Sequence, residues 1–118
     1  MQLNKLIRFT ALSLFVIMLL LLFVGGSQPV AVNLFPAPWD KLVHCLTFGT
    51  MLIIASLAFP KVKPIYLLIA IVTIGALDEI HQIYLPGRSP GLDDLTADLV
   101  GGLIAVILIK CIVYFKAK

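Results

Sequence analysis

Charged residues are scarce in this chain: they make up 13% of its 118 residues, whereas hydrophobic residues make up 61%. Soluble domains contain about a quarter charged residues and about half apolar ones. This composition excludes a soluble globule, and the length allows about four membrane crossings of about 20 residues each. The basic residues flank apolar stretches and form no stripe with interleaved aromatics, so we expect a lipid bilayer and no nucleic acid as partner.

Cysteine is also rare, with only Cys45 and Cys111. They fall near opposite ends of apolar stretches, which a membrane helix separates by about 30 Å, too far for a disulfide. The chain has no CxxC, no Cys/His spacing typical of zinc, no P-loop, no nucleophile elbow and no metalloprotease helix. From motifs alone we therefore predict no cofactor and no metal site.

Apolar runs separated by helix breakers predict an all-α membrane protein, a single domain over residues 1–118 with a bundle of four transmembrane helices. The predicted spans are approximately residues 6–24, 40–59, 65–85 and 93–115. A cleaved signal peptide is the rival interpretation of the first span. Its apolar run is near the upper length limit for such a peptide, and no clean A-x-A site follows, so we favour an uncleaved helix.

The two signs of charge mark opposite ends of the predicted spans. Basic residues near the N-terminus, in the second loop and at the C-terminus predict that both termini are cytoplasmic (N-in/C-in). All six acidic residues lie toward the other end: Asp40, Asp78, Glu79, Asp93, Asp94 and Asp98. We expect a multi-pass protein of the bacterial cytoplasmic (inner) membrane, with a polar site that faces the periplasm or exterior.

Helical phase predicts that these polar residues converge, at about 100° per residue. Those that share a face are Asp40 and His44 in the second span, Asp78, Glu79 and Gln82 in the third, and Asp94 and Asp98 in the fourth. Asp40 also suits a helix N-cap. Gly101 and Ala105 continue the last stripe with small residues, which is typical of close helix contacts in lipid.

The predicted cluster carries too little positive charge for its acids. Only Lys41 and Arg88 lie with the six carboxylates, and crowded carboxylates in a medium of low dielectric cannot all remain ionised. Three solutions stay open: some acids are protonated, His44 and His81 are cationic, or the site recruits a cation. Each of them makes the cluster responsive to pH.

Four short blocks carry a family resemblance. They are Asp40-Lys41-x-x-His44, Asp78-Glu79-x-x-Gln82, Pro86-Gly87-Arg88 and Asp94-x-x-x-Asp98-x-x-Gly101. In this order, over about residues 40–105, they resemble the VanZ-like family of small bacterial membrane proteins. The family often has asparagine where this chain has Asp98. The aspartate keeps a polar group at this position and adds a possible charge. The resemblance implies a multi-span cell-envelope protein, and the name-giving member is associated with low-level teicoplanin resistance.

The pattern predicts an outward-facing polar pocket that binds an amphiphilic envelope precursor or lipid headgroup and, if catalytic, hydrolyses it or transfers groups on it. The catalytic candidates, as general acids or bases, are Glu79, Asp94 and His44. The substrate-binding candidates are Lys41 and Arg88, which suit a phosphate, and Gln82, Asp78, Asp40 and Asp98. A divalent cation on Glu79, Asp94 and Asp98 is a weaker alternative.

Two other classes of function stay open. A non-catalytic binding or assembly protein that affects glycopeptide susceptibility would use the polar faces only to fold or to pair with a partner. A proton or ion pathway would need polar groups along the whole crossing. The inner halves of the spans offer few polar groups besides glycine, such as Ser13, Ser56 and Thr73, which argues against a pathway. The sequence predicts no oligomeric state.

Overall fold

The computed structural model describes residues 2–32, 34–88 and 90–118. Within these residues the chain forms four α-helices and no strand: α1 (Gln2–Phe23), α2 (Trp39–Ala58), α3 (Pro64–Ile83) and α4 (Leu92–Lys116). Two short 3-10 turns, η1 (Gly25–Ser27) and η2 (Pro29–Ala31), connect α1 to α2. Each of the four helices is long and apolar enough to cross a membrane. The prediction of an all-α membrane protein with four spans is therefore confirmed.

The two helices with acids in their first turn, α2 and α4, each begin one residue before the predicted one. Pro38 takes the cap position of α2, so Asp40 lies in the first turn of the helix. The prediction that Asp40 is the N-cap is therefore wrong, although its charge still lies at the positive end of the helix dipole. Asp93 and Asp94 occupy the first turn of α4 in the same way, behind Gly91 at the cap position.

The third helix ends two residues earlier than predicted, at Ile83. Tyr84 and Leu85 continue in a tight turn, with the Leu85 N–H donating to the Gln82 carbonyl at 3.1 Å. The next residue is a proline, which disfavours helical backbone at the residue before it. This turn, rather than a further helical turn, carries the chain toward Arg88.

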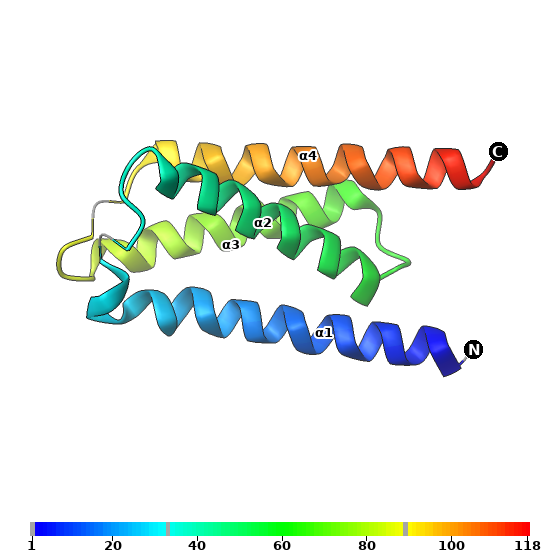
Figure 1. Ribbon diagram of the computed structural model, residues 1–118, viewed down its shortest axis with the longest axis horizontal. Coiled ribbons are helices and arrows are strands. Elements are labelled where there is room, and N and C mark those ends of the chain that lie inside the picture. Colours follow the sequence, from blue (N-terminus) through cyan, green and yellow to red (C-terminus); the bar gives the residue numbers. More distant parts are fainter. Residues whose placement is uncertain (1, 33, 89) are drawn as a thin grey trace.

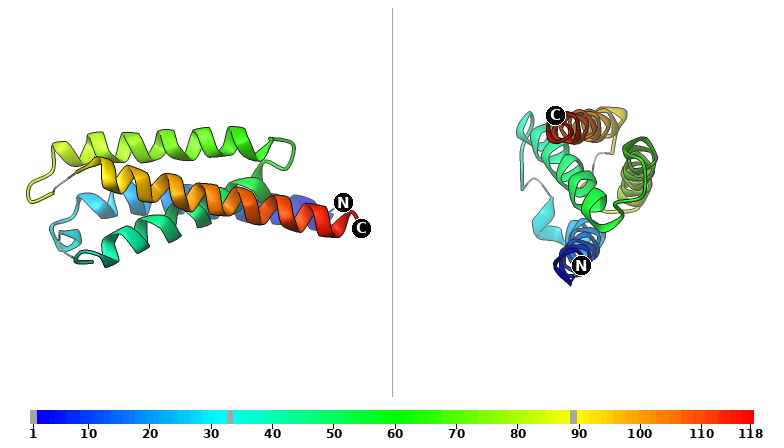
Figure 2. Two further views of the ribbon diagram at one scale, coloured as in Figure 1. Left: turned by 90° about the horizontal axis from the view of Figure 1, so that it is seen from above. Right: turned by 90° about the vertical axis from the view of Figure 1, so that its right-hand side faces the viewer.

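The four helices run side by side along the longest dimension of the molecule (Figure 1). Both termini lie at one end, together with the α2–α3 loop, and the α1–α2 and α3–α4 connections lie at the other. Seen along the bundle, α2 lies between α1 and α4 (Figure 2). The α1 helix packs mainly on α2 and touches α3 at few places, so α1 is the loosest member of the bundle.

The core lies where α2, α3 and α4 meet. Phe48, Met51 and Leu52 of α2 are fully buried there, with Ile71 of α3 and Ala105 of α4 nearly so. Most large apolar side chains elsewhere on the helices are exposed, as expected for surfaces that face lipid. The core therefore fixes α2, α3 and α4 against each other just below the predicted polar cluster.

Glycines let α2 and α4 approach at backbone distance. A Cβ on Gly49 would lie 2.9 Å from the Gly101 carbonyl oxygen, and a Cβ on Gly101 would overlap the Cys45 carbonyl. Small residues at such positions allow close helix contacts in membranes. This contact lies one turn from both His44 and Asp98, so it holds those two side chains within reach of each other.

Candidate functional site

Four of the six acidic residues are buried: Asp78, Glu79, Asp94 and Asp98. They come from α3 and α4, and they lie near the end of the bundle that carries the α1–α2 and α3–α4 connections. Burial of a charged group is costly unless it finds a partner. The partners of these carboxylates therefore define how the site is built.

Lys41 links the first turns of α2 and α4. Its Nζ lies 2.8 Å from Asp40 Oδ2, 2.5 Å from Asp94 Oδ1 and 3.3 Å from Asp93 Oδ2. We call Lys41, Asp40, Asp93 and Asp94 the outer ion cluster. The Lys41 ammonium group has three donors, and three carboxylates surround it. Its charge is thus engaged within the protein.

His44 and Asp98 form the inner pair between α2 and α4. His44 Nδ1 lies 2.8 Å from Asp98 Oδ1, and the Asp98 side chain is fully buried. A carboxylate beside Nδ1 favours the tautomer in which Nδ1–H donates, which leaves Nε2 with a lone pair. Gly75 of α3 makes room for this pair, because a Cβ there would lie 2.7 Å from Asp98 Oδ2.

The adjacent acids of α3 point to different surroundings. Asp78 Oδ2 accepts a hydrogen bond from Gln82 Nε2 at 3.0 Å, one turn along the same helix. Glu79 Oε2 accepts the backbone N–H of Gly91 at 2.8 Å, at the start of α4. Glu79 therefore ties the α3–α4 connection to α3, whereas Asp78 lies on the side of α3 that faces the α1–α2 connection.

Arg88 reaches across the end of the bundle. Gly87 before it has a φ of 75°, a conformation that favours glycine. The Arg88 guanidinium donates from Nη2 to the Gly26 carbonyl at 2.5 Å, which joins the α3–α4 connection to η1. Among the described residues no carboxylate lies within ion-pair distance of Arg88, and its buried Nε has no hydrogen-bond partner. Its positive charge is thus not neutralised within the described chain.

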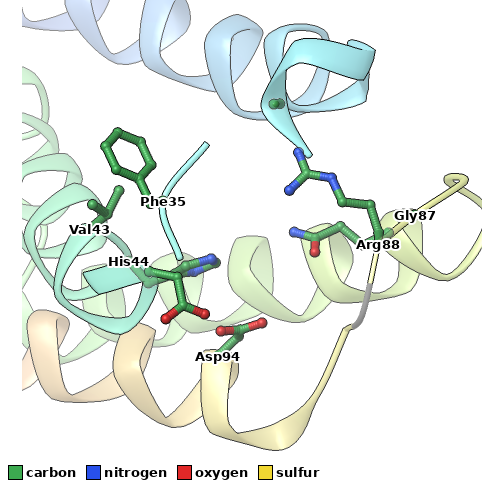
Figure 3. Close-up of a pocket in the computed structure, with 9 residues that line it drawn as sticks. Phe35, Val43, His44, Gly87, Arg88 and Asp94 are labelled. Atoms are coloured by element: carbon green, nitrogen blue, oxygen red, sulfur yellow. The ribbon is translucent and has the colours of Figure 1, made fainter. Parts of the chain in front are cut away.

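A polar cavity of about 190 Å³ lies between these groups. Figure 3 shows His44 of α2, Asp94 of α4 and Arg88 of the α3–α4 connection around it. Its lining also includes Asp40, Gln82 and Gly87, with Ala31, Phe35 and Val43.

A larger cavity of about 410 Å³ adjoins the polar one. The two share His44, Gln82 and Arg88 as well as Phe35 and Val43. The larger cavity extends to Met18, Leu21 and Leu22 of α1, to Thr47 and Leu85, and to Asp78 and His81. Most of its lining is apolar. The two cavities together form one amphiphilic site, polar at the end of the bundle and apolar toward α1.

The predicted site residues divide into three groups. Asp40, His44, Gln82, Arg88 and Asp94 line the polar cavity, and Asp78 lines the larger one. Lys41 and Asp98 stand behind that lining as partners of Asp94 and His44. Glu79 lines a separate cavity between α3 and α4 with Ile80, Ile83 and Leu95.

Sequence reasoning missed the apolar half of the site. Met18, Leu21 and Leu22 lie in a run of leucines and similar residues whose members all suit lipid contact equally well. Nothing in that run distinguishes a side chain that lines a cavity from one that faces the bilayer. The Gly26 carbonyl that receives Arg88 was missed for the same reason, because every residue carries a carbonyl.

Comparisons with known proteins extend the resemblance over nearly the whole chain. Residues 2–114 match the family model described as VanZ/LLP1. No curated protein matches the chain. No solved structure matches it either.

Proposed function

This chain belongs to the VanZ/LLP1 family, and we propose that it is a bacterial cell-envelope protein whose joined cavities bind an amphiphile with an anionic headgroup. The headgroup would be a phosphate ester, carried by a membrane lipid or by a lipid-linked envelope precursor. The observation that carries this proposal is the position of Arg88, a cation without a carboxylate partner among the described residues, where the polar cavity meets the apolar one.

Arg88 suits a phosphate for geometric and electrostatic reasons. A guanidinium presents two parallel N–H donors that match two phosphate oxygens. Its present partner is a neutral carbonyl oxygen on Gly26, which an anionic phosphate would outcompete as an acceptor. Lys41 is less suited to this role, because a ligand would have to displace one of the three carboxylates around it.

The apolar cavity supports a hydrocarbon chain as the second part of the ligand. Met18, Leu21 and Leu22 of α1 line it, and α1 touches α3 at few places. A lipid could therefore enter from the bilayer between α1 and α3, with its headgroup toward Arg88 and its first methylene groups along α1.

The proposed site faces the periplasm or the exterior of a bacterium. The support is the distribution of basic residues, which the end of the bundle with the termini and the α2–α3 loop collects (Figure 1). By their positions in the chain, Lys5 and Arg8 belong to the first turns of α1, Lys61 and Lys63 to the α2–α3 loop and Lys116 to the end of α4. The positive-inside rule assigns this end to the cytoplasm. Single cysteines in a background without Cys45 and Cys111 test this. We expect an impermeant thiol reagent to label Gln28→Cys and not Lys61→Cys in intact cells. The reverse labelling would invert the proposed orientation.

The binding proposal is tested by mass spectrometry of the lipids that copurify with the protein. Arg88→Gln should lose the phosphate-bearing lipids by about tenfold, which corresponds to about 1.4 kcal/mol. Arg8→Gln is a matched control, because Arg8 also donates to a backbone carbonyl, that of Ala58 at 3.4 Å, at the other end of the bundle. Equal lipid content in the two variants would exclude the proposed role of Arg88 and favour a non-catalytic assembly role for the polar faces.

A second candidate function, hydrolysis at the headgroup, is favoured by the inner pair. His44 lines the polar cavity and Asp98 fixes its Nδ1, an arrangement suited to a general base. His44 Nε2 would take the proton from a water molecule as its oxygen bonds to phosphorus. The same proton would then pass to the alkoxide oxygen released when the ester P–O bond breaks.

This second candidate has its own assay. We expect phosphate release from a short-chain phosphorylated amphiphile in micelles, reduced about 100-fold or more by His44→Gln. His81→Gln serves as the control, because His81 lines only the apolar cavity and lies beside Phe23. Absence of release by the wild-type protein would leave binding alone as the proposed function.

A further inference from the structure

Besides Asp40 Oδ1 in the outer ion cluster, two buried carboxylate oxygens have no hydrogen-bond partner among the described residues: Asp98 Oδ2 and Glu79 Oε1. Each carboxylate uses only its other oxygen, toward His44 in one case and toward the Gly91 N–H in the other. Both side chains are more than nine-tenths buried. An unpartnered buried oxygen on an acidic group is costly, so these two atoms point to a positive ligand.

The residues that carry these oxygens belong to a compact set of metal-ligating side chains. One ligand atom from each of His44, Glu79 and Asp98 can be chosen so that all three lie within 4.8 Å of one another. The three residues come from α2, α3 and α4, so the set lies where the three packed helices meet. Asp98 Oδ2 faces α3 across Gly75, where the missing side chain leaves it space.

The distribution of charge around the set supports a cation. Lys41 is engaged by Asp40, Asp93 and Asp94, and Arg88 by a carbonyl oxygen. Among the described residues, Asp78 and Glu79 have no cationic side chain within ion-pair distance, and His44 is the only such partner of Asp98. The inner part of the cluster therefore lacks positive charge, although the outer ion cluster does not.

We propose that His44, Glu79 and Asp98 bind one divalent cation, in which case His44 is a metal ligand and not the general base of the second candidate function. An imidazole nitrogen and two carboxylate oxygens form a mixed donor set, which favours Mn²⁺ or Zn²⁺ over Ca²⁺ or Mg²⁺, whose usual ligands are all oxygen. Three protein ligands leave at least one coordination position for water or a ligand oxygen. The sequence had suggested Asp94 with the same two acids, but Asp94 is held by Lys41, and His44 takes its place.

The cation would also explain how an acidic site accepts an anion. His44 lines the polar cavity beside Arg88, so a divalent ion there would add positive charge next to the proposed headgroup position. This link rests on the proposed function, whereas binding of the ion itself does not. Metal binding is measured without lipid, and lipid binding by the comparison of Arg88→Gln with Arg8→Gln, so either proposal can fail alone.

Titration of the purified full-length protein with Mn²⁺, followed by the loss of the free-ion signal in electron paramagnetic resonance, tests the site. We expect one ion per chain, bound about tenfold or more weakly by Glu79→Gln and by Asp98→Asn, each of which exchanges a charged oxygen ligand for a neutral one. Asp93→Asn is the matched control, because it removes a carboxylate from the outer ion cluster and should leave the affinity unchanged. Zn²⁺ is tested by competition with bound Mn²⁺.

A second measurement keeps the test independent of the variants' folding. Electron spin-echo modulation of the wild-type protein with Mn²⁺ should show coupling to a nitrogen nucleus, which His44→Gln removes. Lack of saturable Mn²⁺ binding, binding without nitrogen coupling, or an equal loss of affinity in Asp93→Asn and Glu79→Gln would each overturn the proposal.

Discussion

The two ends of the bundle use ionisable residues in opposite ways. At the end with the termini, Lys5, Arg8, Lys61, Lys63 and Lys116 are exposed, and none of them forms an ion pair within the described chain. At the other end, four carboxylates of α3 and α4 are buried, and their partners lie on α2, on α3 and in the α3–α4 connection. The basic end needs only water and lipid headgroups as partners. The partners of the acidic end are brought together by the packing of the helices, so its arrangement depends on the fold and that of the basic end does not.

The largest loss of stability should come from a substitution at the glycine contact between α2 and α4, which lies beneath the acidic end. Gly101→Ala places a methyl group against the Cys45 carbonyl of α2, which must push α2 and α4 apart. We expect a loss of about 3 kcal/mol of stability, the upper end of typical overpacking costs, measured by unfolding in detergent. Gly25→Ala is the control, because its nearest neighbour is a Leu21 methyl at 4.0 Å. Equal stability of the two variants would mean that the helices are not held at backbone distance.

Removal of divalent ions should have the next largest effect. We call the proposed cation site on His44, Glu79 and Asp98 the inner site. If it binds Mn²⁺ in the folded state only, Mn²⁺ at a hundred times its dissociation constant adds about 2.7 kcal/mol of stability. A chelator should therefore lower the melting temperature of the wild-type protein by more than that of Glu79→Gln, because tenfold weaker binding leaves at most about 1.4 kcal/mol of this stabilisation in the variant. The same decrease in both would place the ion outside the inner site.

Replacement of one lysine should cost less stability than either of these changes, and the cost should differ between the two ends of the bundle. Lys41→Gln leaves the buried Asp94 without its cation, whereas Lys61→Gln at the basic end removes an exposed charge. A third of the Lys41 side chain is exposed, so solvent screens the pairing and the expected cost is about 1 kcal/mol. Lys61→Gln should cost nothing measurable in the same unfolding assay, and similar losses in the two would contradict the comparison.

The smallest effect is expected at Asp93, although it belongs to the acidic end. Its side chain is 71% exposed and its oxygen lies 3.3 Å from Lys41 Nζ, a geometry in which ion pairs contribute little. Asp93→Asn should leave the melting temperature, the copurifying lipids and Mn²⁺ binding unchanged. A clear loss of any of them would extend the inner site to the first residues of α4.

Helical phase predicted two kinds of contact in this site: contacts within one helix, and contacts between residues that lie at the same membrane depth on neighbouring helices. Asp78 and Gln82 meet because they are four residues apart on α3, and His44 and Asp98 meet because both lie at the same depth on facing stripes. The four spans were predictable because prolines interrupt long apolar runs. These features follow from periodicity and solvent preference, which the sequence contains.

The remaining features depend on how the helices rotate and on the path of the loops. Glu79 lies next to Asp78 but turns to the Gly91 N–H, and Arg88 donates to a carbonyl on the far side of the cavity. Neither partner is a side chain, so no residue type in the sequence indicates it. The leucines of α1 that line the larger cavity could not be predicted either. A helix that is apolar on every side has no polar face from which its orientation can be inferred.

The contact between Gly49 and Gly101 has a mechanical consequence for the proposed cation. Backbones this close cannot slide or rotate past each other, so His44 and Asp98 move together as one stiff part. Glu79 stands on α3, whose packing against α2 is much sparser than that of α4. The distance between Glu79 and the inner pair is therefore the one that can change most easily. A small tilt of α3 would change this distance and with it the affinity of the proposed site for an ion.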